Sequence, residues 1–113
     1  MWLNAARAFF HRLSVAVVVV EMSTKKVIAA SGAACRLLNK DLMGLEFLGL
    51  LSDRGNGDRL WAEMDRQGYA HNHITFVGRN GGGINATIAS ETIKLPSGNS
   101  YAILKLIPEI KKQ

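Results

Sequence analysis

The sequence predicts an α+β domain with a single five-stranded antiparallel sheet, short helices on one face of the sheet, and an amphipathic helix at the N-terminus. Three observations support this fold class. A β-branched run and a short apolar segment, separated by a polar turn, are typical of a β-hairpin. A stretch with helix caps and spaced glycines follows, which predicts a helical crossing. The last part of the chain has a two-residue apolar period, which predicts a three-stranded meander.

Residues 1–13 form the predicted N-terminal cap helix. Apolar side chains recur at three- and four-residue steps, and Asn4, Arg7 and His11 form the polar side at the same spacing. A short helix cannot leave such an apolar stripe in water, so the stripe must pack on its own domain or on a second copy. We expect it to form a homodimer interface. The expected interface residues are Trp2, Leu3, Ala6, Phe9, Phe10 and Leu13.

The first hairpin and the helix after it are predicted from residue 15 onward. Residues 15–22 predict a strand, because consecutive β-branched residues are typical of strands that are buried on both faces. A polar turn then leads to a short second strand at 27–30. Ser31 is a suitable N-cap for a helix over 32–38, and Asn39 can end that helix.

The middle of the chain predicts further helices. Residues 41–51 are apolar but contain two glycines, so we expect short helical turns there. Residues 52–57 are expected to form a polar loop. Residues 58–67 predict the most regular helix of the chain, with Asp58 as its N-cap and Gly68 as its C-terminal stop.

Three strands are predicted to close the chain, at about 69–77, 84–95 and 100–107. Apolar and polar side chains alternate through much of this region, which is the period of a half-buried strand. The segments RNGGG (79–83) and PSGN (96–99) separate the strands, and their glycine and asparagine residues tolerate the positive φ angles of tight turns.

Composition limits the possible classes of protein. The chain has 113 residues, of which 48% are hydrophobic and 20% charged, and these values are typical of one soluble domain, here residues 14–113. Cys35 is the single cysteine, which excludes a disulfide framework and a cysteine-based zinc site. The longest apolar run, 15–20, is too short to span a membrane. We therefore expect a cytoplasmic protein, with which a free cysteine agrees.

From residue 15 onward the chain resembles a PAS domain. That family has an apolar strand ending in an acid, a small-residue helix, a longer helix, a glycine turn, and two strands with an Asp-Ile-Thr-like tail. The chain departs from this pattern at Glu21, Ser31, Asn80 and the tail residues 109–111. The matching segments are AVVVVE (16–21), KVIAASGAACRLL (26–38), DLMG (41–44), the helix at 58–67, RNGGG (79–83), PSGN (96–99) and PEIK (108–111).

The resemblance implies a sensory or regulatory domain in signal transduction. It implies homodimerisation, binding of a small ligand, and control of a downstream effector domain such as a kinase, a cyclase or a transcription factor. Trp61 is either part of the core or a surface on which a ligand stacks. Asn72 is expected among apolar side chains, where a buried amide needs a partner or serves as the polar group of a pocket. The candidate ligand-binding residues are Trp61, Met64, Asn72, Ile74 and Phe76.

The cofactor is left open by the sequence. Haem-binding PAS domains commonly have an axial histidine on the helix that here spans 58–67, and this helix contains none. Photoactive flavin relatives use a cysteine in a different segment from the one with Cys35. We therefore expect neither haem nor a flavin adduct, and non-covalent flavin or a metabolite remains. His71 and His73 share one face of a strand, but no third metal ligand is evident.

Two other classes of function are alternatives. A small enzyme on a curved sheet would line its pocket with Trp61, Asn72 and His73, but the sequence has no hydrolase, metalloprotease or P-loop motif. We assign no catalytic residue. A basic nucleic-acid-binding domain is suggested by the net charge of +5, but the lysines and arginines are scattered and form no stripe.

Overall fold

The computed structural model describes residues 15–78 and 82–109. The predicted cap helix, its expected interface residues and the domain boundary at residue 14 lie outside these ranges. No helix within these ranges is long and apolar enough to cross a bilayer. The elements are, in order, β1 (Ala16–Glu21), β2 (Val27–Ala30), α2 (Gly32–Leu38), the 3-10 helix η1 (Phe47–Leu50), α3 (Arg54–Gln67), β3 (Tyr69–Val77), β4 (Gly83–Lys94) and β5 (Ser100–Pro108).

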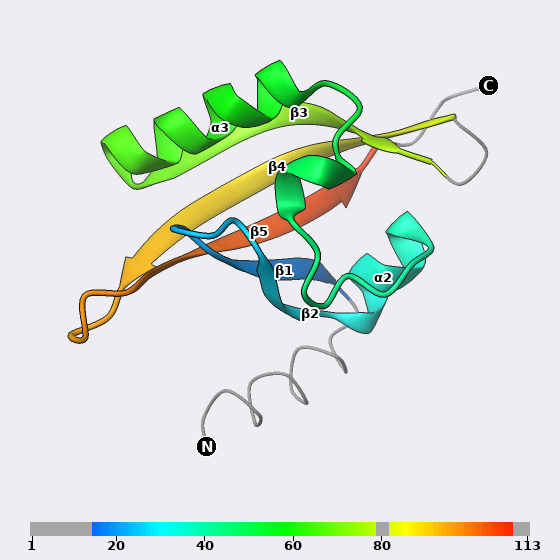
Figure 1. Ribbon diagram of the computed structural model, residues 1–113. Helices are drawn as coiled ribbons and strands as arrows, with labels where there is room; N and C mark the ends of the chain where they lie inside the picture. Colours follow the sequence, from blue (N-terminus) through cyan, green and yellow to red (C-terminus); the bar gives the residue numbers. More distant parts are fainter. Residues whose placement is uncertain (1–14, 79–81, 110–113) are drawn as a thin grey trace.

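The five strands form one antiparallel sheet in the order β2-β1-β5-β4-β3. β1 and β2 make the first hairpin, and β3, β4 and β5 make the meander. β5 joins the two parts by pairing with β1 from Ala16 opposite Leu106 to Glu21 opposite Tyr101. α3 lies along β3 and β4, and α2 lies beside β1 (Figure 1). The predicted α+β fold class, with one five-stranded antiparallel sheet, is confirmed.

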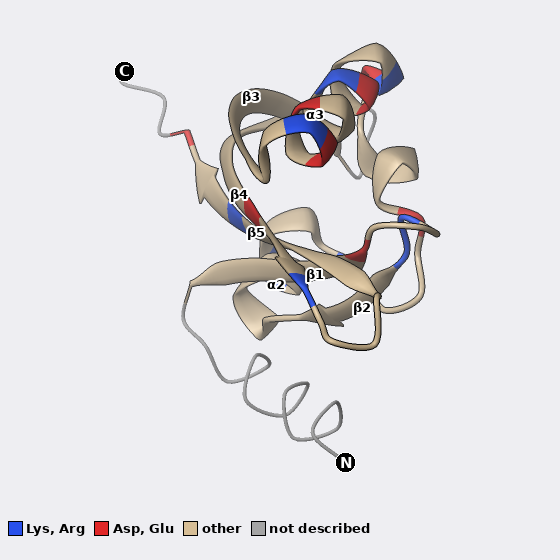
Figure 2. Ribbon diagram, turned by 90° about the vertical axis from the view of Figure 1, so that its left-hand side faces the viewer, with Lys and Arg blue, Asp and Glu red and all other residues tan. Residues whose placement is uncertain are grey.

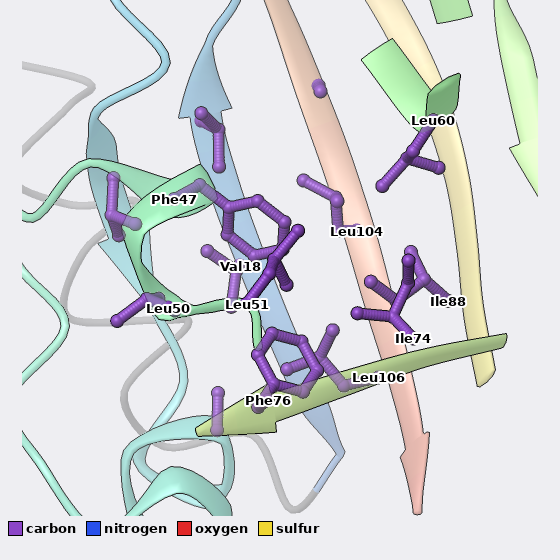
Figure 3. Packing of buried hydrophobic residues seen from close by; sticks show 14 of the residues in the cluster. Val18, Phe47, Leu50, Leu51, Leu60, Ile74, Phe76, Ile88, Leu104 and Leu106 are labelled. Atoms are coloured by element: carbon purple, nitrogen blue, oxygen red, sulfur yellow. The ribbon is translucent and has the colours of Figure 1, made fainter. Parts of the chain in front are cut away.

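The core lies between the sheet and the helices. Every second residue of each strand points toward this side, as strand geometry requires. Phe47 of η1 joins the layers, because its ring makes an edge-on contact with Phe76 of β3 at 5.9 Å and a tilted contact with Trp61 of α3 at 6.0 Å between centroids. Figure 3 shows other buried side chains of the same core, among them Val18, Leu50, Leu51, Leu60, Ile74, Ile88, Leu104 and Leu106.

α2 begins at the predicted cap, and this cap also joins the helix to the sheet. The Ser31 hydroxyl oxygen accepts from the backbone N–H of Ala34 at 3.1 Å, which is the N-cap bond. It also accepts from the backbone N–H of Val17 in β1 at 2.9 Å. Ser31 is fully buried, so one oxygen satisfies two backbone donors inside the core. Asn39 ends α2 in the left-handed conformation, as predicted.

The predicted start of the long helix is wrong. α3 begins at Arg54 instead of following a cap at Asp58, and Asp53 is its N-cap. The Asp53 carboxylate accepts from two backbone N–H groups of the first turn, at 2.9 Å and 3.3 Å, so the supposed polar loop becomes helical. The glycine at position 57 fits this turn, because a Cβ there would lie 2.5 Å from Leu51 Cδ1 and 2.7 Å from Leu48 Cδ2. The helix ends at Gly68, with φ 83°, as predicted.

The segment before α3 protects the outer edge of β2. The prediction of short helical turns over 41–51 is confirmed for η1. Residues ahead of it pair with the edge strand, since Val27 N–H donates to the Leu45 carbonyl at 2.9 Å and Gly44 N–H donates to the Val27 carbonyl at 2.9 Å. An exposed strand edge invites pairing with other chains, so these bonds remove that risk along part of β2.

Candidate functional site

The main candidate site is an open groove of about 760 Å³ between α3 and one end of the sheet. Its size is within the range of small-molecule sites. One wall is α3, and the other consists of the end of β1, the turn after it, and the β4–β5 connection. We call it the α3 groove. Its lining residues are Glu21, Met22, Ser23, Lys25, Asp58, Trp61, Ala62, Met64, Asp65, Thr92, Lys94, Gly98, Asn99 and Ser100.

At the floor of the groove, hydrogen bonds hold the two walls to each other. The Trp61 indole N–H donates to the Met22 carbonyl at 3.3 Å, which holds the middle of α3 against the end of β1. At the C-terminal end of α3, the Gly68 carbonyl accepts from both the backbone N–H and the hydroxyl of Thr92, at 2.8 Å and 3.1 Å. The groove is therefore anchored at two points along α3, one at the middle of the helix and one at its C-terminal end.

The charged side chains of the groove are arranged on opposite walls. Asp58 and Asp65 lie two helical turns, or about 10 Å, apart on α3. The facing wall has Lys25 in the turn after β1 and Lys94 at the end of β4. Charged residues gather on α3, whereas the strands carry few (Figure 2). Glu21 also lines the groove, and its carboxylate accepts from the Thr24 hydroxyl at 2.8 Å.

These lysines and aspartates form no ion pair with each other. Within residues 15–78 and 82–109, the ion pairs are Arg54 with Glu46 at 2.7 Å and His73 with Glu109 at 2.9 Å, and neither is in the α3 groove. Asp58, Asp65 and Lys94 are exposed. The groove therefore presents carboxylate and ammonium groups that are free to meet a ligand.

The structure separates the predicted ligand-binding residues. Trp61 and Met64 line the groove, although both side chains are buried against the core. Ile74 and Phe76 lie inside the core at 3% and 0% exposure, away from the groove lining. Asn72 is half-buried on β3, opposite Ile88. Sequence reasoning missed the charged residues of the groove, although the spacing of Asp58 and Asp65 around Trp61 places all three on one side of a helix.

The two strand histidines lie on the face of the sheet opposite the core. His73 Nδ1 is 2.9 Å from a Glu109 carboxylate oxygen and 3.1 Å from the Thr87 hydroxyl, so β3, β4 and the residue that follows β5 contribute to one polar row. Glu109 is also held by its backbone N–H, which donates to the Asn85 carbonyl at 3.1 Å. Among the described residues, no group of three or more His, Cys, Asp or Glu is arranged to hold a metal ion.

Comparison with known proteins identifies the fold. No protein-family model and no curated protein matches the sequence. Solved structures do: a PAS domain from a two-component sensor histidine kinase has a TM-score of 0.79 at 10% identity, covering 96% of each chain. The PAS domain of an HTR-like protein from Haloarcula marismortui has a TM-score of 0.74 at 11% identity, covering 94% of this chain and 90% of that one.

A LOV protein from Rhodobacter sphaeroides is also similar, with a TM-score of 0.78 at 15% identity, covering 98% of this chain and 70% of that one. These similarities extend over nearly the whole chain. The chain therefore has the fold of PAS domains, as the resemblance in its sequence predicted.

Proposed function

We propose that this chain is a sensory domain that binds a small ligand in the α3 groove and controls an effector domain through the end of β5. The observation that carries the proposal is the position of the groove, which lies at one end of β5, while the chain leaves the sheet at the other. Ser100, the first residue of β5, lines the groove, and Pro108 is the last residue of the strand. Structural similarity to a domain of a sensor histidine kinase supports this class of function.

β5 is suited to connect the two ends. It pairs on both sides, with β1 and with β4, so it cannot shift without its neighbours. Its nine residues span roughly 25–30 Å at the rise of an extended strand. Beyond it, Glu109 is held by His73 and Asn85. We call the end of β5 and the residue after it the exit. A ligand that favours one arrangement of the groove would thus favour one arrangement of the exit. Such a shift requires that the ligand bind the two arrangements with different affinities.

The proposal predicts coupling between the groove and the exit even when the natural ligand is unidentified. Ala62 is exposed on the groove wall of α3, so Ala62→Trp fills the groove from within. We expect the backbone amide NMR signals of Ile107 and Glu109 to shift in this variant. Ile107 is seven residues beyond Ser100 of the groove, roughly 23 Å along the strand, which is too far for a direct effect of the new ring.

Arg66→Trp is the matched control, because residue 66 is exposed on the same helix but does not line the groove. It should leave the exit signals unchanged. Shifts in Ala62→Trp that stay confined to the groove lining would overturn the proposed coupling.

Dimerisation is part of the proposed function. The face of the sheet opposite the core carries apolar side chains that are exposed or partly exposed, including Ile93 at 42% and Ile107 at 42%. The apolar stripe predicted over residues 2–13 joins the chain directly ahead of this sheet. We propose that the stripe and this face together form the contact between two copies.

The dimer can be tested in the full chain by sedimentation velocity. Phe9→Ser combined with Phe10→Ser removes two large members of the stripe and should convert a dimer to a monomer, with an unchanged circular dichroism spectrum. Asn4→Ser combined with His11→Ser alters the polar side of the same segment and should leave the dimer intact. A full chain that sediments as a monomer, or a dimer that survives the double phenylalanine change, contradicts the proposal.

The ligand is proposed to be a metabolite in preference to a flavin. Trp61 is only 7% exposed and its ring packs against Phe47, so little of its face is available for stacking on an isoalloxazine. Absorbance of freshly purified protein checks this: we expect no visible band.

We further propose a cytoplasmic location, since Cys35 is a free thiol. The proposed effector is a domain such as a kinase, cyclase or transcription factor in the same signalling protein.

A further inference from the structure

We propose that the ligand of the α3 groove is a small zwitterion with one ammonium and one carboxylate group, the chemistry of a free amino acid or a short peptide. This inference deepens the proposed sensory function, since it names the class of molecule that the groove would take. It rests on the placement of carboxylates on one wall of the groove and ammonium groups on the facing wall.

The anchoring hydrogen bonds determine which charges face each other. The bond from Trp61 to Met22 brings the turn that contains Lys25 to the middle of α3. The Phe47 N–H donates to the Lys25 carbonyl at 2.7 Å, which holds this turn beside the segment that leads into the half of α3 with Asp58. The two bonds between Gly68 and Thr92 bring the end of β4, with Lys94, to the half of α3 that contains Asp65. Each end of the groove therefore has a carboxylate on the helix wall and an ammonium group on the strand wall.

The opposed charges do not close on each other. No N–O distance between these lysines and aspartates is within ion-pair range in the described part of the chain. A ligand between the walls can bind a charge on each wall, with its ammonium group toward an aspartate of α3 and its carboxylate toward a lysine of the strand wall. Charge-assisted hydrogen bonds of this kind are the stronger ones in proteins.

The balance of charges argues against other ligand classes. A phosphate-rich ligand would meet the carboxylates of Glu21, Asp58 and Asp65, whereas a polyamine would meet Lys25 and Lys94. Uncharged groups add donors and acceptors that suit a peptide-like backbone, among them the side chains of Thr92, Asn99 and Ser100. Met22, which lines the groove and is partly buried, can contact a ligand's aliphatic part.

The test is isothermal titration calorimetry on the full chain with each of the twenty standard L-amino acids and with their dipeptides with glycine. At least one should bind at millimolar concentration or below, and the amino acid and dipeptide series separate the two sizes of ligand. For the best binder, the N-acetyl derivative lacks the ammonium group and the C-terminal amide lacks the carboxylate. Each should bind about tenfold more weakly or worse, since a hydrogen bond to a charged group is lost.

The variants Asp65→Asn and Lys94→Gln should each weaken binding by about tenfold as well. Glu63→Gln on α3 and Lys40→Gln beyond α2 are the matched controls, because neither residue lines the groove, and both should bind normally. The inference is overturned if no zwitterion binds, or if the derivatives with a single charge bind as tightly as the parent. That failure is distinct from failure of the proposed function, which the coupling from position 62 to the exit tests without any ligand.

Discussion

Replacing Phe47 with alanine is expected to lower the free energy of unfolding by about 3–5 kcal/mol, the usual cost of truncating a buried phenylalanine. The Phe47 ring is fully buried and contacts both Phe76 and Trp61, so its removal leaves a cavity where η1, α3 and β3 meet. A loss of this size is a large share of the total stability of a small domain. Urea denaturation followed by circular dichroism measures it.

Leu45→Ala is the matched control for this prediction. Leu45 precedes the same 3-10 helix, but its side chain is 38% exposed, so we expect a change of only about 0.5 kcal/mol. If the Phe47 variant is destabilised no more than the Leu45 variant, then the described core is wrong at this point.

Ser31→Ala is the second change with a large expected effect, at about 2–4 kcal/mol. It removes an N-cap, worth about 1 kcal/mol, and it leaves the N–H of Val17 without its partner inside the core, which costs about 1–3 kcal/mol more. Thermal and urea unfolding measure the loss. The hydroxyl of one small residue thus has an effect close to that of a large aromatic ring.

Asp53→Ala separates the two contributions, because Asp53 is also an N-cap but is exposed and bonds only within its own helix. We expect this variant to lose about 1 kcal/mol. Equal losses for the two variants would mean that the bond from Val17 contributes nothing to stability.

Much of the fold could be predicted from local sequence signals. The β-branched run, the two-residue period after Gly68, and the caps at Ser31 and Asn39 all act within a few residues of themselves, and the structure confirms them. The start of α3 was predicted wrongly because the prediction used only the local helix propensity. Asn56 and the neighbouring glycines have low helix propensity, but the cap at Asp53 and the close approach of Leu51 outweigh it.

The candidate site was less predictable because it depends on contacts between distant segments. Trp61 and Met64 were found because they share one side of a helix. The lysines of the opposite wall were not predicted, since Lys25 and Lys94 come near α3 through bonds between distant segments, among them those of Met22 and Thr92. The second bond of Ser31 was missed for a similar reason, because it links residues of different elements.

The position of β5 has a consequence for synthesis of the protein. The central strand of the sheet is also the last to be made, so a growing chain cannot complete its fold until residue 108 has emerged from the ribosome. Until then the β1 and β4 edges that β5 will occupy stay open, and open edges are prone to wrong pairing. The long sequence separation between β1 and β5 also slows folding once the strand is free. Nascent chains halted before this strand should therefore be more sensitive to protease than the released protein.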